Sequence, residues 1–165
     1  MNLVVRGGRV VMPDGVRRAD VLVEDGTVKA LVRGGDPAAG RTLDATDCLI
    51  FPGLVDTHVH MGFDTGEFLS TDDFASGSRA AAFGGVTTLI DYAFPERGQA
   101  LADALRARRS VADGQCYVDY GLHVVLPPNR CDEARDIARC VELGAMSFKL
   151  FTIYPDLELG GGRGV

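Results

Sequence analysis

Short apolar runs separated by turn residues occupy the first fifty positions of the chain. Residues 20–24 and 27–32 flank Asp25-Gly26, where the glycine tolerates the positive φ that a two-residue hairpin turn requires. Residues 34–40 are rich in glycine and predict a loop. The pattern predicts strands over residues 3–5, 9–11, 20–24, 27–32 and 48–50.

The pattern changes after Pro52-Gly53, where apolar segments alternate with segments of helical composition. The expected strands cover residues 54–59, 86–93, 117–126 and 146–153, and the expected helices cover residues 71–83, 99–112 and 132–143. This β-α-β-α-β-α-β order predicts an α/β fold with a parallel sheet and crossover helices. It leaves open whether the sheet is doubly wound or part of a (β/α)₈ barrel.

The first of these helices has start and stop signals in the sequence. The predicted signals are Ser70 or Thr71 as N-cap, Asp72 and Asp73 in the first turn, and Gly84-Gly85 as the stop. We therefore expect helix 71–83 to begin at its first acidic residues.

Composition and charge narrow the class of protein. The 165 residues are 46% hydrophobic and 24% charged, which predicts a packed core, and the net charge of −6 argues against nucleic acid or an anionic membrane as the main partner. No signal peptide or apolar run of membrane-spanning length is present, so we expect a cytoplasmic protein. The cysteines form no CxxC pair and are expected to be reduced; they are Cys48, Cys116, Cys131 and Cys140.

His58 and His60 are the first candidates for chemistry. Residues i and i+2 of a strand point to the same face, so both imidazoles converge at the carboxyl end of the predicted strand 54–59. Parallel α/β folds place their active sites at that end, and neutral imidazole is a common ligand for zinc. The alternative is two histidines that pack at a strand end with no ligand.

Five segments together resemble one enzyme family. They are Phe51-Pro-Gly-Leu-Val-Asp-Thr-His-Val-His60, Asp72-Asp73-Phe74, Gly84-Gly85-Val86-Thr87-Thr88, Val118-Asp119-Tyr120-Gly121-Leu122-His123 and Ser147-Phe148-Lys149-Leu150-Phe151-Thr152-Ile153-Tyr154. In this order they resemble the dihydropyrimidinase and hydantoinase family of the amidohydrolase superfamily. The Gly-Gly-Val-Thr-Thr variant also resembles allantoinases and dihydroorotases, which keeps that alternative open.

The resemblance implies a fold and its division into domains. Residues 1–50 would form a small N-terminal β-sandwich segment, and residues 51–165 would form the first three to four βα units of a TIM-type (β/α)₈ barrel. A complete barrel needs about 250 residues. We therefore expect the chain to be the N-terminal portion of a longer enzyme.

Lys149 lies inside an apolar strand, which is costly for a lysine without a role. It could snorkel to solvent from the strand end. The resemblance instead implies that CO₂ carboxylates Lys149 and that the carbamate bridges two zinc ions, one of them held by His58 and His60. Burial lowers the pKa of an amine, and the neutral amine is the form that reacts with CO₂.

The resemblance also assigns a role to Tyr154, five residues beyond Lys149. Its phenol would donate to the substrate carbonyl and its tetrahedral oxyanion, although an amphipathic rim tyrosine is the alternative. His123 is expected to be structural, and Asp56 and Asp91 to be hydrogen-bond partners. Residues 63–69 follow the histidines and should overhang the active face.

The function implied by the resemblance is metal-dependent ring opening of small cyclic amides by a homo-oligomer, a dimer or a tetramer. The family takes two further histidines and a catalytic aspartate from later strands, and no matching residues follow Lys149 in this chain. Residues 1–165 alone are therefore expected to be inactive. A non-catalytic oligomeric scaffold is the alternative from another class of protein.

Overall fold

The computed structural model describes residues 3–34, 40–127 and 134–151. The chain divides into two compact units, Met1–Pro52 and Gly53–Val165. The sequence-based division was placed two positions earlier, after Ile50.

The first unit consists of two small sheets that share one apolar cluster. Its strands are β1 (Leu3–Arg6), β2 (Arg9–Met12), β3 (Gly15–Arg18), β4 (Asp20–Glu24), β5 (Thr27–Val32), β6 (Arg41–Asp44) and β7 (Leu49–Ile50), in the orders β5-β4-β1-β6 and β3-β2-β7. Val10 from one sheet and Val21 from the other are buried in the cluster. The predicted hairpin is confirmed, because β4 pairs antiparallel with β5 and both Asp25 and Gly26 have positive φ, 48° and 74°.

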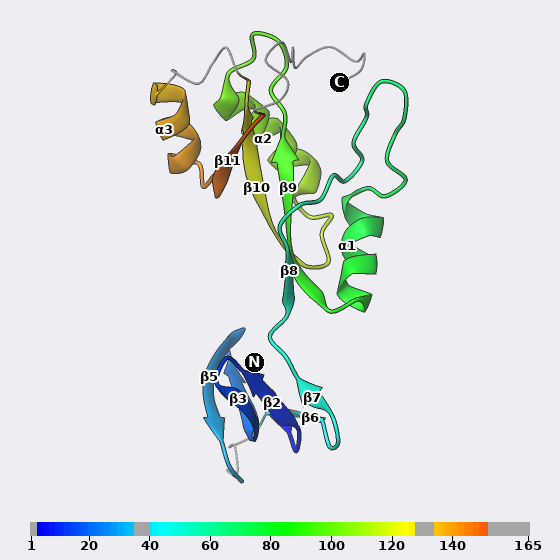
Figure 1. Ribbon diagram of the computed structural model, residues 1–165, viewed down its shortest axis with the longest axis vertical. Coiled ribbons are helices and arrows are strands. Elements are labelled where there is room, and N and C mark those ends of the chain that lie inside the picture. Colours follow the sequence, from blue (N-terminus) through cyan, green and yellow to red (C-terminus); the bar gives the residue numbers. More distant parts are fainter. Residues whose placement is uncertain (1–2, 35–39, 128–133, 152–165) are drawn as a thin grey trace. The chain divides into compact units, whose positions relative to one another are not determined.

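The described residues of the second unit form a parallel sheet and helices (Figure 1). Its elements are β8 (Leu54–Asp56), α1 (Phe74–Phe83), β9 (Val86–Ala93), α2 (Leu101–Ala112), β10 (Asp119–Leu126), α3 (Ala134–Glu142) and β11 (Ser147–Leu150). The strands lie in chain order, β8-β9-β10-β11, and every pairing is parallel. A doubly wound sheet reverses its strand order part-way, and the described strands show no such reversal.

The core of the second unit lies between its inner strands and the helices. Helix α2 packs against β9, β10 and α3, and α1 packs against β9. Leu101 and Leu105 of α2, Val124 of β10 and Cys140 of α3 are fully buried. Burial of such side chains contributes roughly 1.5–3 kcal/mol each, so this interface fixes the inner strands.

The predicted start of α1 was wrong. The helix begins at Phe74, and Asp73 is its N-cap, so neither Asp72 nor Asp73 lies in the first turn. The reason is a capping box that the sequence prediction overlooked. The Asp73 carboxylate accepts from the Ser76 amide at 2.8 Å, while the Ser76 hydroxyl accepts from the Asp73 amide at 3.1 Å.

Candidate functional site

His58 and His60 follow β8 directly, and the structure brings their rings together. Their Nε2 atoms lie 3.3 Å apart. Strand β8 ends at Asp56 rather than at Val59, and the His58 amide donates to the Asp56 carboxylate at 3.1 Å. The Val59 amide donates to the Ile90 carbonyl of β9 at 3.1 Å. This bond holds the backbone beside β9 beyond the end of β8, so both imidazoles reach one point as predicted.

Lys149 of β11 completes the cluster from the opposite edge of the sheet. Its Nζ lies 3.4 Å from the His58 Nε2. Strands β8 and β11 are separated by β9 and β10, a span of about 14 Å in a flat sheet at ordinary strand spacing. The contact therefore requires a sheet that curls, with the three side chains meeting over its concave face.

Tyr92 of β9 lies beneath all three side chains, and sequence reasoning missed it. Its ring centroid lies 4.8 Å from that of His58 and 4.9 Å from that of His60, and the Lys149 Nζ lies 4.3 Å from it. Tyr92 is buried. The available signal was its position at the carboxyl end of the predicted strand 86–93, level with the ends of the strands that carry the other residues.

Burial alters the protonation of two of these groups. Desolvation is the main cause that lowers the pKa of His60, opposed by the nearby Asp91 carboxylate. Desolvation also lowers the pKa of the Lys149 amine. Both shifts favour the neutral nitrogen, which is the form that binds a metal and, for the amine, the form that reacts with CO₂.

His123 of β10 ties the two edge strands to the inner part of the sheet. Its Nε2 lies 3.1 Å from the carbonyl oxygen of Thr57, the residue before His58, and its Nδ1 contacts the hydroxyl of Ser147 in β11. Because the Thr57 carbonyl only accepts, Nε2 carries the proton in this contact. His123 thus has the structural role that we expected.

A buried ion pair holds the backbone immediately after His60. Both side-chain oxygens of Asp91 accept from Arg108 of α2, each at 2.9 Å. Asp91 also accepts from the Met61 amide at 2.8 Å, and Arg108 donates to the Met61 carbonyl. Asp91 is fully buried. The pair therefore fixes both polar groups of Met61, the residue next to the histidine pair.

No protein-family model matches the chain. The chain is 40% identical over 157 residues to a D-hydantoinase from Streptomyces coelicolor, covering 92% of this chain and 34% of that relative. It is 44% identical over 166 residues to the dihydropyrimidinase of Rattus norvegicus, covering 96% of this chain and 32% of that relative. The chain thus spans about a third of the length of these relatives.

A solved structure agrees with the sequence comparison. A crystal structure of D-hydantoinase matches with a TM-score of 0.88 at 30% identity, covering 98% of this chain and 35% of that chain. The chain corresponds to an N-terminal portion of a protein of the hydantoinase and dihydropyrimidinase family. It has the mixed α/β fold of that structure, with a curled parallel sheet.

The zinc that the hydantoinase resemblance implies was tested against the nitrogen positions. Two nitrogen ligands at about 2.0–2.1 Å from a tetrahedral zinc ion lie about 3.3–3.4 Å apart. The separation of 3.3 Å between the two histidine nitrogens matches this spacing. Lys149 would join them through a group carried on its amine, which lies 3.4 Å from the His58 Nε2. Among the described residues no group of three or more His, Cys, Asp or Glu side chains is placed to hold a metal. The fit therefore depends on Lys149 as the third group.

Aromatic side chains wall the hydantoinase-like site beside His60. The ring centroid of Phe63 lies 5.0 Å from that of His60 and 5.0 Å from that of Phe94. These two rings, with Asp64 and Tyr92, also line a neighbouring cavity of about 290 Å³, whose lining includes none of His58, His60 and Lys149. Phe63, the first residue of the segment 63–69, therefore lies beside the site. The expected contribution of the rest of that segment to the substrate pocket stays a prediction.

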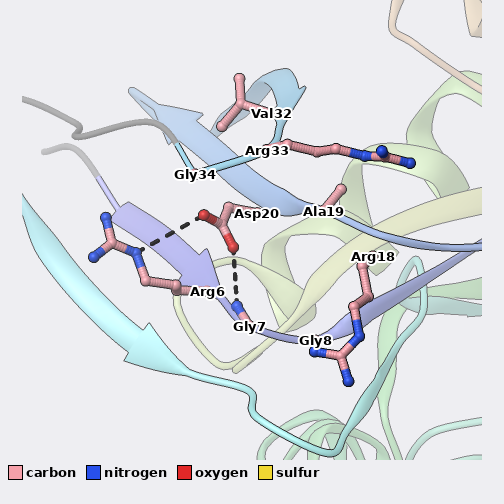
Figure 2. A pocket seen from close by; sticks show the side chains of 9 residues that line it. All are labelled: Arg6, Gly7, Gly8, Arg18, Ala19, Asp20, Val32, Arg33 and Gly34. Atoms are coloured by element: carbon pink, nitrogen blue, oxygen red, sulfur yellow. Dashed lines mark hydrogen bonds and ion pairs between the residues drawn. The ribbon is translucent and has the colours of Figure 1, made fainter.

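A larger cavity, of about 790 Å³, lies elsewhere, in the first unit. Figure 2 shows that the guanidinium groups of Arg6, Arg18 and Arg33 point away from one another. The Asp20 carboxylate already accepts from the Gly7 amide at 2.9 Å and pairs with Arg6 at 3.8 Å. The three guanidinium groups do not converge on one point, so the candidate site remains the one in the second unit.

Two further predictions concern Tyr154 and membrane-spanning segments. Tyr154, the predicted donor to the substrate oxyanion, lies outside the described residues. Within the described residues, none of the helices has the length and apolar character needed to cross a membrane.

Proposed function

We propose that this chain is the metal-binding portion of a hydrolase that opens small cyclic amides such as hydantoins and dihydropyrimidines. The observation that supports this most is the convergence of His58, His60 and Lys149 from opposite edges of one curled sheet. The D-hydantoinase and dihydropyrimidinase relatives support the class of substrate. Since the chain spans only about a third of their length, the activity is proposed for a protein in which the remaining part accompanies it.

The proposal includes the finer description of the fold. The four parallel strands in chain order are half the number in a (β/α)₈ barrel. We propose that the second unit is the first half of such a barrel and that the first unit is part of a β-sandwich. Further strands would then cover the outer edges of β8 and β11 and supply the ligands that these residues lack.

His58 and His60 would hold one zinc ion, and Lys149 would connect it to a second. The neutral Lys149 amine would attack CO₂. An N–C bond forms, one C=O π bond opens onto oxygen and the nitrogen releases one proton, so the anionic carbamate could serve as a metal ligand. Bound zinc supplies Lewis acidity and lowers the pKa of water. Tyr154 would donate its phenolic hydrogen to the substrate oxygen on which charge develops.

Other properties follow from the family in the same way. We propose a cytoplasmic homo-oligomer, a dimer or a tetramer. Residues 1–165 by themselves would not hydrolyse hydantoin or dihydrouracil, because they offer three ligand side chains for a site with two metals and no general base for the attacking water.

The test is zinc content and ring opening in the complete protein. Replacing His58 or His60 by alanine should remove bound zinc and activity together, because each imidazole contributes one metal bond. Equilibrium dialysis with mass-spectrometric metal analysis measures the first, and hydrolysis of dihydrouracil measures the second. Full zinc content in either variant would contradict the ligand assignment.

The chain contains its own control for the carbamate. It has two lysines, Lys149 in the site and the exposed Lys29. With ¹³C-labelled bicarbonate and zinc, a carbamate resonance should appear in wild type and in Lys29→Ala but not in Lys149→Ala. Short carboxylic acids should restore part of the activity of Lys149→Ala by replacing the carbamate. A zinc-loaded, active wild type without that resonance would exclude the carbamate.

A further inference from the structure

The orientation of His60 is not fixed by the usual kind of contact. A metal-ligating histidine almost always donates its second ring nitrogen to a carboxylate, carbonyl or water, and this bond sets the direction of the ring. The His60 Nδ1 is buried and has no hydrogen-bond partner among the described residues. Something other than a hydrogen bond must therefore hold this ring.

Ring packing provides that support, and Tyr92 is its centre. The His60 ring stacks on Tyr92 with an interplanar angle of 28° and a centroid separation of 4.9 Å. Phe63 and Phe94 approach the same imidazole, at 5.0 and 5.7 Å. Tyr92 differs from these two because its ring also contacts the other members of the site.

Tyr92 contacts His58 and Lys149 through the same ring. The His58 centroid lies 4.8 Å away, and the Lys149 Nζ lies 4.3 Å from the Tyr92 centroid and 4.8 Å from that of Phe151. The amine nitrogen of Lys149 therefore rests against two aromatic faces. One ring therefore limits the positions of two imidazoles and an amine that come from opposite sheet edges.

Tyr92 is itself held rigidly. On β9 it follows Asp91, and alternation along a strand sends the two side chains to opposite faces of the sheet. Asp91 is bound to Arg108 and Met61, and Tyr92 is level with His123 in the register between β9 and β10, with ring centroids 4.8 Å apart. The ring is thus fixed before any metal arrives.

We propose that Tyr92 is a positioning residue for the His58, His60 and Lys149 site, acting through the faces of its ring and not through its hydroxyl. The inference rests on the proposed metal site. Tyr92 supplies no metal ligand. Its ring orients His60 in place of the hydrogen bond that the His60 Nδ1 lacks.

The test compares zinc affinity among variants of Tyr92 in the complete protein, measured by competition with a chromophoric chelator. Tyr92→Phe keeps the ring and should bind zinc as wild type does. Tyr92→Leu removes the ring and should weaken zinc binding by about 10- to 100-fold, the range expected when the group that orients a ligand is lost. Tyr120→Leu, at a half-buried tyrosine of β10 whose phenol contacts Asp113, is the matched control and should leave zinc affinity unchanged.

The outcomes separate this inference from the proposed function. Equal zinc affinity in wild type and a folded Tyr92→Leu would overturn the inference, and so would a Phe variant as weak as the Leu variant. If Tyr92→Leu does not fold, Tyr92→Ile, which suits a strand, takes its place. Wild type that binds no zinc, or binds it equally without His58, would instead overturn the metal site itself.

Discussion

The edge strands of the parallel sheet carry the side chains that meet at the site, whereas the inner strands carry those that hold them. His58 and His60 follow β8 and Lys149 lies on β11, each at an edge with one paired neighbour in the described sheet. Asp91 and Tyr92 lie on β9 and His123 on β10, each paired on both sides. The site therefore combines groups from the less supported strands with contacts from the better supported ones.

Burial shows the same contrast. Leu89 of β9 and Val124 and Val125 of β10 are at most 1% exposed, whereas Leu54 and Val55 of β8 are 57% and 56% exposed and Leu150 of β11 is 54% exposed. Edge strands need neighbours to satisfy their free backbone groups. The difference teaches that a rigid interior can define a site even where the ligand-bearing strands have only one neighbour each.

The largest expected effect comes from the inner support. Asp91→Asn removes the charge that pairs with Arg108, and leaving one partner of a buried pair uncompensated costs about 3–5 kcal/mol in the free energy of unfolding. Urea denaturation measures the loss. Asp103→Asn, in the exposed pair with Arg106 on α2, is the matched control and should change stability by about 1 kcal/mol or less. Similar losses in both would show that β9 gains no special support from its pair.

The second prediction compares how much stability the metal-free protein loses when an inner histidine or an edge histidine is replaced. His123→Ala removes the contacts with the exposed Thr57 carbonyl and the partly buried Ser147 hydroxyl, each worth about 0.5–1.5 kcal/mol. His58→Ala removes an exposed side chain and should cost about 0.5 kcal/mol or less. Thermal unfolding in the presence of a chelator measures both, and the reverse order of stabilities would refute the division between support and ligand.

A smaller loss of stability is expected at α1, the helix that connects the edge strand β8 with the inner strand β9. Asp73→Ala removes the N-cap and should destabilise the protein by about 1 kcal/mol. The neighbouring Asp72→Ala, whose side chain is exposed and caps nothing, is the control. Equal changes in the urea midpoint would indicate that the capping box contributes nothing.

The last prediction concerns a reaction rate in the core beside β10. It involves no change in the free energy of unfolding. Burial raises the pKa of the Cys140 thiol to about 11, so at pH 8 only about one molecule in a thousand carries the reactive thiolate. Pulsed alkylation followed by peptide mass spectrometry should label the exposed Cys48 first, and Cys140 only after unfolding or as the pH approaches 11. Equal labelling rates at pH 8 would show that the core beside β10 opens readily.

Sequence patterns predicted the parts of the fold that are apolar or marked by strong turns. Strands β4 and β5 match the expected residues because Asp25-Gly26 fixes their register. Strands β3 and β6 were missed since all eight of their residues are exposed and show no apolar alternation; their pairing with β2 and β1 defines them.

The candidate site shows the same limit. The spacing of two residues predicted that His58 and His60 converge, and the apolar surroundings of Lys149 indicated a role for it. Neither pattern contains the curl that brings β8 and β11 within reach of each other. Tyr92 was missed for this reason, because its importance arises from contacts across three strands that no local pattern records.

The curled sheet also has a consequence for the order of events during synthesis. Lys149 follows His58 by 91 residues, so at roughly 5–20 residues per second the lysine leaves the ribosome about 5–20 seconds after the histidine pair. Any zinc captured in that interval would be held by two imidazoles alone. A metal retained until β11 pairs with β10 would link the two edges of the sheet. Each tenfold excess of free zinc over its dissociation constant would then add about 1.4 kcal/mol to the stability of the curled sheet.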